Sequence, residues 1–143
     1  MTWDKIIKAT AAVAGAIAGL LGEWNTLLTI LVIAMATDYI TGLIVAGVFH
    51  KSTKSETGAL ESRAGWKGLC RKGMSLLIVL IAARLDLALG LNVVRDAVVI
   101  GFIFNEVISI LENAGLMGVE YPSALRNALD LLKKKSESPA KTE

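Results

Sequence analysis

The feature that most constrains the fold of this chain is the apolar run at residues 27–49. A helix of this length crosses the hydrocarbon core of a bilayer, which is about 30 Å thick. The run carries one formal charge, Asp38, which lies at its centre. Insertion scales put the cost of an aspartate at mid-membrane at about 2.5–3.5 kcal/mol. We therefore predict a transmembrane helix whose carboxylate faces polar groups rather than lipid.

Three further apolar segments lie at residues 6–22, 73–91 and 97–117. Of the 143 residues, 54% are hydrophobic, and the mean hydropathy is +0.58. Apolar residues gathered in long blocks, with the charge mostly between the blocks, are typical of membrane proteins. The sequence predicts an all-α integral membrane protein with three to four transmembrane helices, which together form a transmembrane domain at residues 1–117.

The first apolar segment leaves the number of crossings open. Trp3 and Trp24 flank it, and on a helix they would lie about 31 Å apart. Indole rings prefer the headgroup level, so this spacing favours a full crossing. The alternative is an amphipathic helix at the membrane surface, which the small residues of the segment favour less.

A C-terminal region follows at residues 118–143. Its apolar positions Leu125, Ala128, Leu129 and Leu132 recur at helical spacing, which predicts a short basic amphipathic helix after Pro122. The closing residues, SESPAKTE, have a composition typical of disorder.

Basic residues indicate the orientation of the chain. The predicted loop at residues 50–72 contains six of them: Lys51, Lys54, Arg63, Lys67, Arg71 and Lys72. Loops rich in lysine and arginine remain on the cytoplasmic side, so we expect this loop and the C-terminus there in a multi-pass protein. Indoles and basic side chains are expected at the lipid headgroups: Trp3, Trp24, Trp66, Lys67, Arg71 and Lys72.

Three charges fall near the centres of predicted spans: Asp38, Arg84 and Glu106. One interpretation is that Arg84 bridges Asp38 or Glu106, within one chain or between chains, and only holds the helices together. The other is that these charges line a polar seam that becomes wet when subunits assemble. The polar residues Asn105, Ser109 and Asn113 beside Glu106 favour the second interpretation, because a helix packed only against lipid has no use for them.

Small residues indicate where helices approach closely. Gly15 and Gly19 form a GxxxG pattern, while Ala34, Gly42 and Ala46 share one helical face with Asp38. Such faces promote helix association in membranes. We expect Asp38 to lie on a packing face.

Other classes of function lack support. One cysteine and one histidine provide neither a disulfide nor a metal site, and no nucleophile is spaced with a base as an enzyme requires. We expect no catalytic residue, no metal or other cofactor and no nucleic-acid partner.

Three motifs resemble the phage lysis and toxin-secretion holin family: TDYITGLI at 37–44, SRAGWKGLCRKG at 62–73 and FNEVISILENAGLMGVEYPSALRNAL at 104–129. The resemblance extends over residues 27–134, and the third motif is the most specific. It implies a phage-encoded protein of the bacterial cytoplasmic membrane, often with three crossings, which accumulates, forms homo-oligomers and opens lesions that release an endolysin.

The resemblance also implies that an antiholin encoded elsewhere could act as a partner, since the next methionine after Met1 is Met35. Some relatives are associated with toxin export. The alternative class is a non-lytic membrane component, either a channel subunit or an assembly scaffold.

Overall fold

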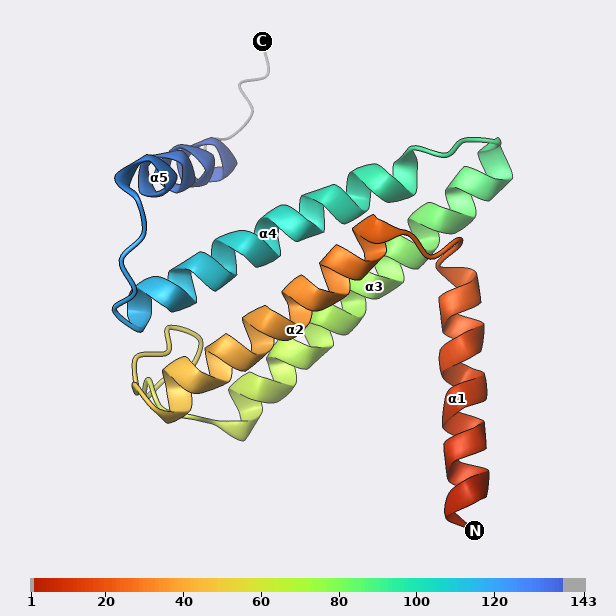
Figure 1. Ribbon diagram of the computed structural model, residues 1–143, viewed down its shortest axis with the longest axis horizontal. Coiled ribbons are helices and arrows are strands. Elements are labelled where there is room, and N and C mark those ends of the chain that lie inside the picture. Colours follow the sequence, from red (N-terminus) through yellow and green to blue (C-terminus); the bar gives the residue numbers. More distant parts are fainter. Residues whose placement is uncertain (1, 138–143) are drawn as a thin grey trace.

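The protein is described by a computed structural model over residues 2–137, and the described chain is entirely helical outside its turns and loops. Five helices follow one another along the chain (Figure 1). Their bounds are α1 Trp3–Leu20, α2 Thr26–Gly47, α3 Ser62–Leu89, α4 Val94–Leu116 and α5 Ser123–Glu137. The predicted all-α fold is confirmed. The predicted disordered tail was placed too early by two residues, since Ser136 and Glu137 form the end of α5, and its residues 138–143 lie outside the described part of the chain.

Helices α2, α3 and α4 run side by side as an up-down-up bundle, and α4 makes the most extensive contacts (Figure 1). Buried positions in α2 recur every three or four residues, a spacing that keeps one face of a helix against its neighbours. They include Leu28, Leu31, Met35, Asp38 and Val45. Asp38 therefore occupies a position that a hydrophobic residue would normally fill.

The bundle interior is apolar in the half that contains the N-terminus of α2. Leu28, Leu31, Val79 and Val99 are almost completely buried there. Full burial of such side chains stabilises a fold by about 1.5–3 kcal/mol each. The other half of the interior, toward the C-terminus of α2, contains the buried charges.

The apolar end of the bundle is closed by Asp86 and Arg95. Asp86 accepts hydrogen bonds from the backbone N–H groups of Val94 (3.0 Å) and Arg95 (2.9 Å), so it caps the N-terminus of α4 from the preceding helix. The Arg95 guanidinium donates to the carbonyl oxygens of Leu21 (3.1 Å) and Glu23 (2.8 Å). These bonds connect the α1–α2 link to the α3–α4 turn.

The other end of the bundle is covered by the loop at residues 48–61. Gly58 adopts φ +75°, and a Cβ atom on it would lie 2.6 Å from the carbonyl oxygen of His50. The loop folds back on itself at this point, where Ser52 N donates to Gly58 O at 3.0 Å. Glycine is required here because the chain approaches itself so closely.

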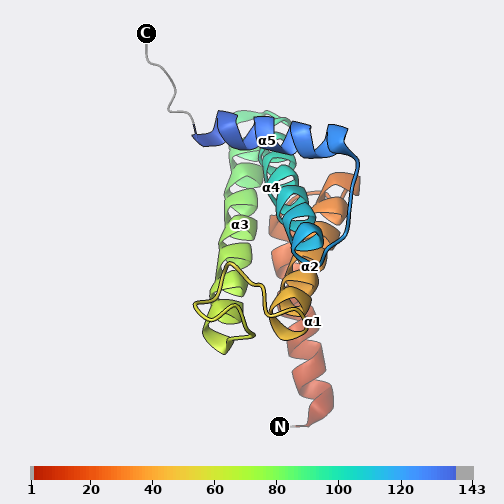
Figure 2. The ribbon, with the colours of Figure 1, turned by 90° about the vertical axis from the view of Figure 1, so that its left-hand side faces the viewer.

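Helices α1 and α5 lie outside the bundle. α1 has no buried residue and diverges from the other helices, whereas α5 lies across the bundle direction (Figure 2). α5 covers most of the predicted C-terminal amphipathic helix. One of the described helices, α2, is long and apolar enough to cross a membrane by its length and composition.

Helix α3 differs from the expected boundaries. It begins at Ser62, within the predicted polar loop at 50–72, and its first turns are polar and basic. The apolar segment at 73–91 thus forms only the second part of one 28-residue helix. Hydropathy located the apolar part of the helix but not its start, because helix formation does not require apolar residues.

Candidate functional site

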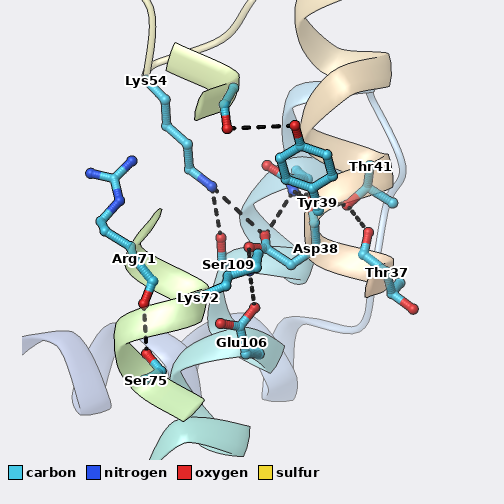
Figure 3. Close-up of polar contacts among 12 residues, drawn as sticks. Thr37, Asp38, Tyr39, Thr41, Lys54, Arg71, Lys72, Ser75, Glu106 and Ser109 are labelled. Atoms are coloured by element: carbon cyan, nitrogen blue, oxygen red, sulfur yellow. Dashed lines mark hydrogen bonds and ion pairs between the residues drawn. The ribbon is translucent and has the colours of Figure 1, made fainter. Parts of the chain in front are cut away.

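The centre of the bundle contains a lysine between two carboxylates. The Lys72 Nζ atom lies 2.7 Å from Asp38 Oδ2 and 2.6 Å from Glu106 Oε2, so that α3 is joined to both α2 and α4 (Figure 3). Asp38 is 5% exposed, and the side chain of Lys72 is 15% exposed. Buried charges are tolerated when they are paired and hydrogen-bonded, as these are.

The Asn113 amide also donates to the Asp38 carboxylate and links it to the Thr41 hydroxyl. The Asn113 amide nitrogen lies 3.1 Å from Asp38 Oδ1 and 2.9 Å from Thr41 Oγ1. The Thr41 hydroxyl donates to the Thr37 carbonyl oxygen at 2.8 Å. Every buried side-chain polar atom in the described residues has a hydrogen-bond partner, so the cluster is closed within this chain.

A second cation reaches the cluster from the loop. The Lys54 ammonium donates to Ser109 Oγ at 3.2 Å and lies 3.8 Å from Asp38 Oδ1 (Figure 3). Its side chain is 45% exposed, so this contact is the solvent-facing side of the network. We use the name polar cluster for Asp38, Thr41, Lys54, Lys72, Glu106, Ser109 and Asn113.

The local sequence explains why these residues meet. In α4, Val99, Phe102, Glu106, Ser109 and Asn113 follow one another at steps of three or four and form the face that points into the bundle. The face changes from apolar to polar at Glu106. In α3, steps of three or four backward from the buried Val79 lead through Leu76 to Lys72.

The structure corrects the expected pairing of Arg84 within the chain. Arg84 is exposed and forms no hydrogen bond or ion pair among the described residues, and Lys72 takes the place between the two acids. The reason is geometric: Arg84 lies twelve residues, or about 18 Å, further along α3. Lys72 was expected at the lipid headgroups and is instead internal.

Of the other polar residues predicted on the fourth span, two lie inside the bundle and one lies on its surface. Ser109 and Asn113 belong to the polar cluster, as described above, whereas Asn105 is exposed on α4. The polar face of α4 that points into the bundle is therefore narrower than the sequence predicted, because it does not include Asn105.

The small residues of α2 and those of α1 differ in how closely they pack against other helices. Ala34 and Ala46 are buried, and a Cβ atom on Gly42 would lie 3.8 Å from the Asn113 amide nitrogen. Gly15 and Gly19 lie on α1, where a Cβ atom would meet nothing within 4 Å. The face of α2 that carries small residues thus packs inside the bundle. The corresponding face of α1 contacts no other part of the described chain.

The residues expected at the headgroups are mostly exposed. Trp3, Trp24 and Trp66 are all more than half exposed, and Lys67 and Arg71 are exposed on the first turns of α3. Trp24 also donates to Thr29 Oγ1 at 2.8 Å.

Sequence reasoning missed Lys54 and Thr41 in the cluster, together with the capping pair Asp86 and Arg95. Thr41 lies three residues after Asp38, so helical spacing could have identified it. A loop has no such period, and no sequence signal leads to Lys54. The described residues include no group of three or more His, Cys, Asp or Glu side chains placed to hold a metal ion.

The arrangement as a whole is that of a small helical membrane-type protein: exposed apolar helices around an internal, fully paired set of charges. A profile of the bacteriophage holin family matches residues 15–134. A probable holin of Bacillus phage phi105 is 36% identical over 117 residues, which cover 81% of this chain and 79% of the relative. The chain belongs to the bacteriophage holin family.

Two bacterial relatives are similar over slightly more of the chain. An uncharacterised protein of Halalkalibacterium halodurans is 40% identical over 91% of this chain and 96% of its own length. An uncharacterised protein of Listeria monocytogenes is 41% identical over 85% of this chain and 83% of its own. No solved structure matches the chain significantly.

Proposed function

We propose that this protein is a phage holin that accumulates in the cytoplasmic membrane of a bacterial host, oligomerises, and opens lesions through which an endolysin reaches the cell wall. The observation that carries the proposal is the polar cluster in the interior of a bundle with an apolar exterior. Membership of the holin family supports it.

The bundle is suited to a multi-pass position in the membrane. α2 has 22 residues and is therefore about 33 Å long, which matches the hydrocarbon core. Exposed isoleucine, leucine and valine side chains lie on α2, on the second half of α3 and on α4. We propose that all three helices cross, with or without α1 as a fourth.

The placement of the connections supports the expected orientation. The loop at 48–61 and the C-terminus of α4, from which α5 continues, lie at the same end of the bundle (Figure 1). Basic residues gather at this end: Lys51 and Lys54 lie in the loop, Arg63, Lys67 and Arg71 follow on the first turns of α3, and α5 contains Arg126, Lys133, Lys134 and Lys135. Such a cluster favours the cytoplasmic side.

The polar cluster provides a mechanism for a delayed opening. In the closed subunit, Lys72 neutralises one charge and Lys54 faces Asp38, so the bundle interior is almost neutral. Separating the helices in lipid would expose charges that cost about 2.5–3.5 kcal/mol each. Assembly removes this barrier when the polar faces of several subunits surround a common water-filled lumen.

The membrane potential offers a trigger. Moving one elementary charge through the whole potential is worth about 2.3 kcal/mol per 100 mV. Loss of the potential therefore changes the balance between the closed and open arrangements of a charged interior by an amount comparable with the cost of exposing one charge.

The proposal is tested by inducible expression in a bacterium with and without a co-expressed cytoplasmic endolysin. A holin halts growth abruptly after a delay, and the culture lyses only when the endolysin is present. A non-lytic channel subunit or an export scaffold leaves the endolysin inside and gives no abrupt lysis, and that result would reject the proposal.

A further inference from the structure

A cavity of about 280 Å³ extends from the loop at 48–61 to the polar cluster. Its wall is formed by the loop, by helices α2 and α3, and by Glu106 and Ser109 of α4 (Figure 3). At the share of about 30 Å³ that each molecule has in liquid water, this volume corresponds to roughly nine water molecules. The cavity is therefore large enough for a connected group of water molecules.

The lining of the cavity is polar and balanced in formal charge. Three acids and three bases line it: Asp38, Glu61, Glu106, Lys54, Arg71 and Lys72. Hydroxyl groups are contributed by Ser52, Ser55, Ser75 and Ser109. Because the charges balance, the lining favours no ion of either sign, whereas each of these groups is stabilised by hydration. Water is the occupant that this chemistry fits.

Side-chain exposure indicates that the cavity opens at the loop. Lys54, which extends from the loop to Ser109 and Asp38, is 45% exposed. Deeper in the cavity, the side chains of Lys72 and Glu106 are still 15% and 13% exposed, respectively. The charged groups at the centre of the bundle thus remain accessible from the loop end.

Beyond the charges, each of the three bundle helices contains a completely buried apolar residue at the same spacing of seven. The three steps are Asp38 to Leu31, Lys72 to Val79 and Glu106 to Val99. Each step leads away from the loop, because α2 and α4 have their C-termini at the loop end and α3 has its N-terminus there (Figure 1). Seven residues of helix are about 10.5 Å long.

The residues reached by these steps form one layer across the bundle. Leu31, Val79 and Val99 are each 0% exposed and belong to the same apolar core cluster. We use the name apolar layer for these three residues. Apolar constrictions block the passage of water and ions by excluding water, so this layer closes the path that the cavity opens.

We propose that the closed subunit contains an aqueous half-channel. Water enters from the loop side as far as the polar cluster, and the apolar layer is the gate that stops it. The inference deepens the proposed function, because it places the permeability barrier of the closed state in one half of the bundle. It rests on the proposal that the bundle crosses a membrane, but it does not depend on lytic activity.

The test is cysteine labelling of the full chain, with Cys70→Ser removing the exposed native thiol. Single cysteines replace Ser75, which lines the cavity, and Val79 in the apolar layer. A charged, membrane-impermeant thiosulfonate is added to inverted and to right-side-out vesicles from cells with low expression. We expect Ser75→Cys to react at least about tenfold faster from the loop side, because only a hydrated thiolate reacts. Val79→Cys should react from neither side.

Two control variants define the depth and the side of the labelling. Met74 is next to Ser75 on α3 and is 55% exposed, but it does not line the cavity, so it faces lipid when the bundle crosses the membrane. Met74→Cys should therefore stay unlabelled, because a thiol in apolar surroundings remains protonated. Thr53→Cys, in the exposed part of the loop, identifies the loop side by its rapid labelling.

Each possible result separates the half-channel from the wider proposal. An unlabelled Ser75→Cys beside a labelled Thr53→Cys would overturn the half-channel, and labelling of Val79→Cys from the side opposite the loop would overturn the gate. Equal, rapid labelling of Met74→Cys and Ser75→Cys would show that the bundle does not cross the membrane and would reject both proposals. The expected labelling pattern without lysis in the expression test would reject only the lytic function. Unchanged helical circular dichroism of the purified variants shows that folding is intact.

Discussion

Lys72 and Asp38 form an ion pair across the interior of the bundle, with Nζ and Oδ2 2.7 Å apart and the two residues 34 positions apart in sequence. The pair connects the middle of α2 to the polar first half of α3. The carboxylate of an apolar helix is thus paired with a cation from a segment that hydropathy assigns to a loop.

Replacing Lys72 by methionine should destabilise the bundle strongly. The change leaves Asp38 and Glu106 buried without their shared cation, and loss of one partner of a buried ion pair typically costs about 3–5 kcal/mol. Thermal unfolding in detergent, followed by circular dichroism, measures the effect.

Two variants make that result specific. Lys67→Met removes an exposed lysine from the same helix and should change stability by less than about 0.5 kcal/mol. Combining Lys72→Met with Asp38→Asn and Glu106→Gln should recover most of the loss, because no buried charge remains without a partner and Lys54 is half exposed. An unchanged Tm for Lys72→Met would show that the ion pairs do not stabilise the bundle.

Glycine substitutions in α3 should have opposite effects at two positions. Gly73 has open space at its Cβ position, so Gly73→Ala should stabilise the helix by up to about 1 kcal/mol. Gly65 faces Tyr39 Oη, so Gly65→Leu should cost about 1–3 kcal/mol through overpacking. Equal Tm changes at the two sites would argue against the close approach of Tyr39.

Asp86→Ala should loosen the start of α4. The variant removes the acceptor for the N–H groups of Val94 and Arg95, and loss of a helix cap costs about 0.5–2 kcal/mol. Amide hydrogen exchange at Val94 and Arg95 should become faster. Asp4→Asn, which removes an exposed aspartate from the first turn of α1, should leave their exchange unchanged. Acceleration in both variants would contradict the capping role.

The loop should lose a stabilising contact at acidic pH. The backbone N–H and then the hydroxyl of Thr57 donate to the Glu61 carboxylate and lower the pKa of Glu61. Because the folded-state pKa is depressed, this stabilisation is present above the unfolded-state pKa and is lost as the pH falls through the lowered value. Carbon-13 NMR of the Glu61 carboxyl should show a midpoint below the ordinary glutamate value.

Thr57→Ala provides the control for this titration. It removes the hydroxyl donor and keeps the N–H donor, so the Glu61 midpoint should rise part of the way to the ordinary value. A wild-type midpoint at or above the ordinary value would rule out the loop contact.

Much of this architecture could be predicted from the sequence. The apolar blocks locate α2, the second half of α3 and α4, and Asp38 and Glu106 were expected at similar heights. Helical spacing also placed Ser109 and Asn113 with Glu106 on one face of α4. These features follow from local periodicity, which the sequence contains directly.

The identity of the central cation could not be predicted in the same way. Hydropathy places the middle of the third span near Arg84, whereas the helix begins at Ser62 and so brings Lys72 level with Asp38. Lys54 reaches the cluster from a loop whose path depends on the close approach at Gly58. Both contacts depend on tertiary geometry that no local pattern records.

The time course of induced lysis with a co-expressed endolysin tests the central claim, that the polar cluster governs the opening of the membrane. Asp38→Asn is compared with the wild type and with Asp4→Asn, an exposed aspartate at the start of α1, at equal amounts in the membrane fraction. The account predicts that Asp38→Asn delays or abolishes lysis, because the polar faces that surround the water-filled lumen then carry one charge less and stabilise it less. Asp4→Asn should lyse with the wild-type onset. Lysis of the Asp38→Asn culture at the wild-type time or earlier would contradict it.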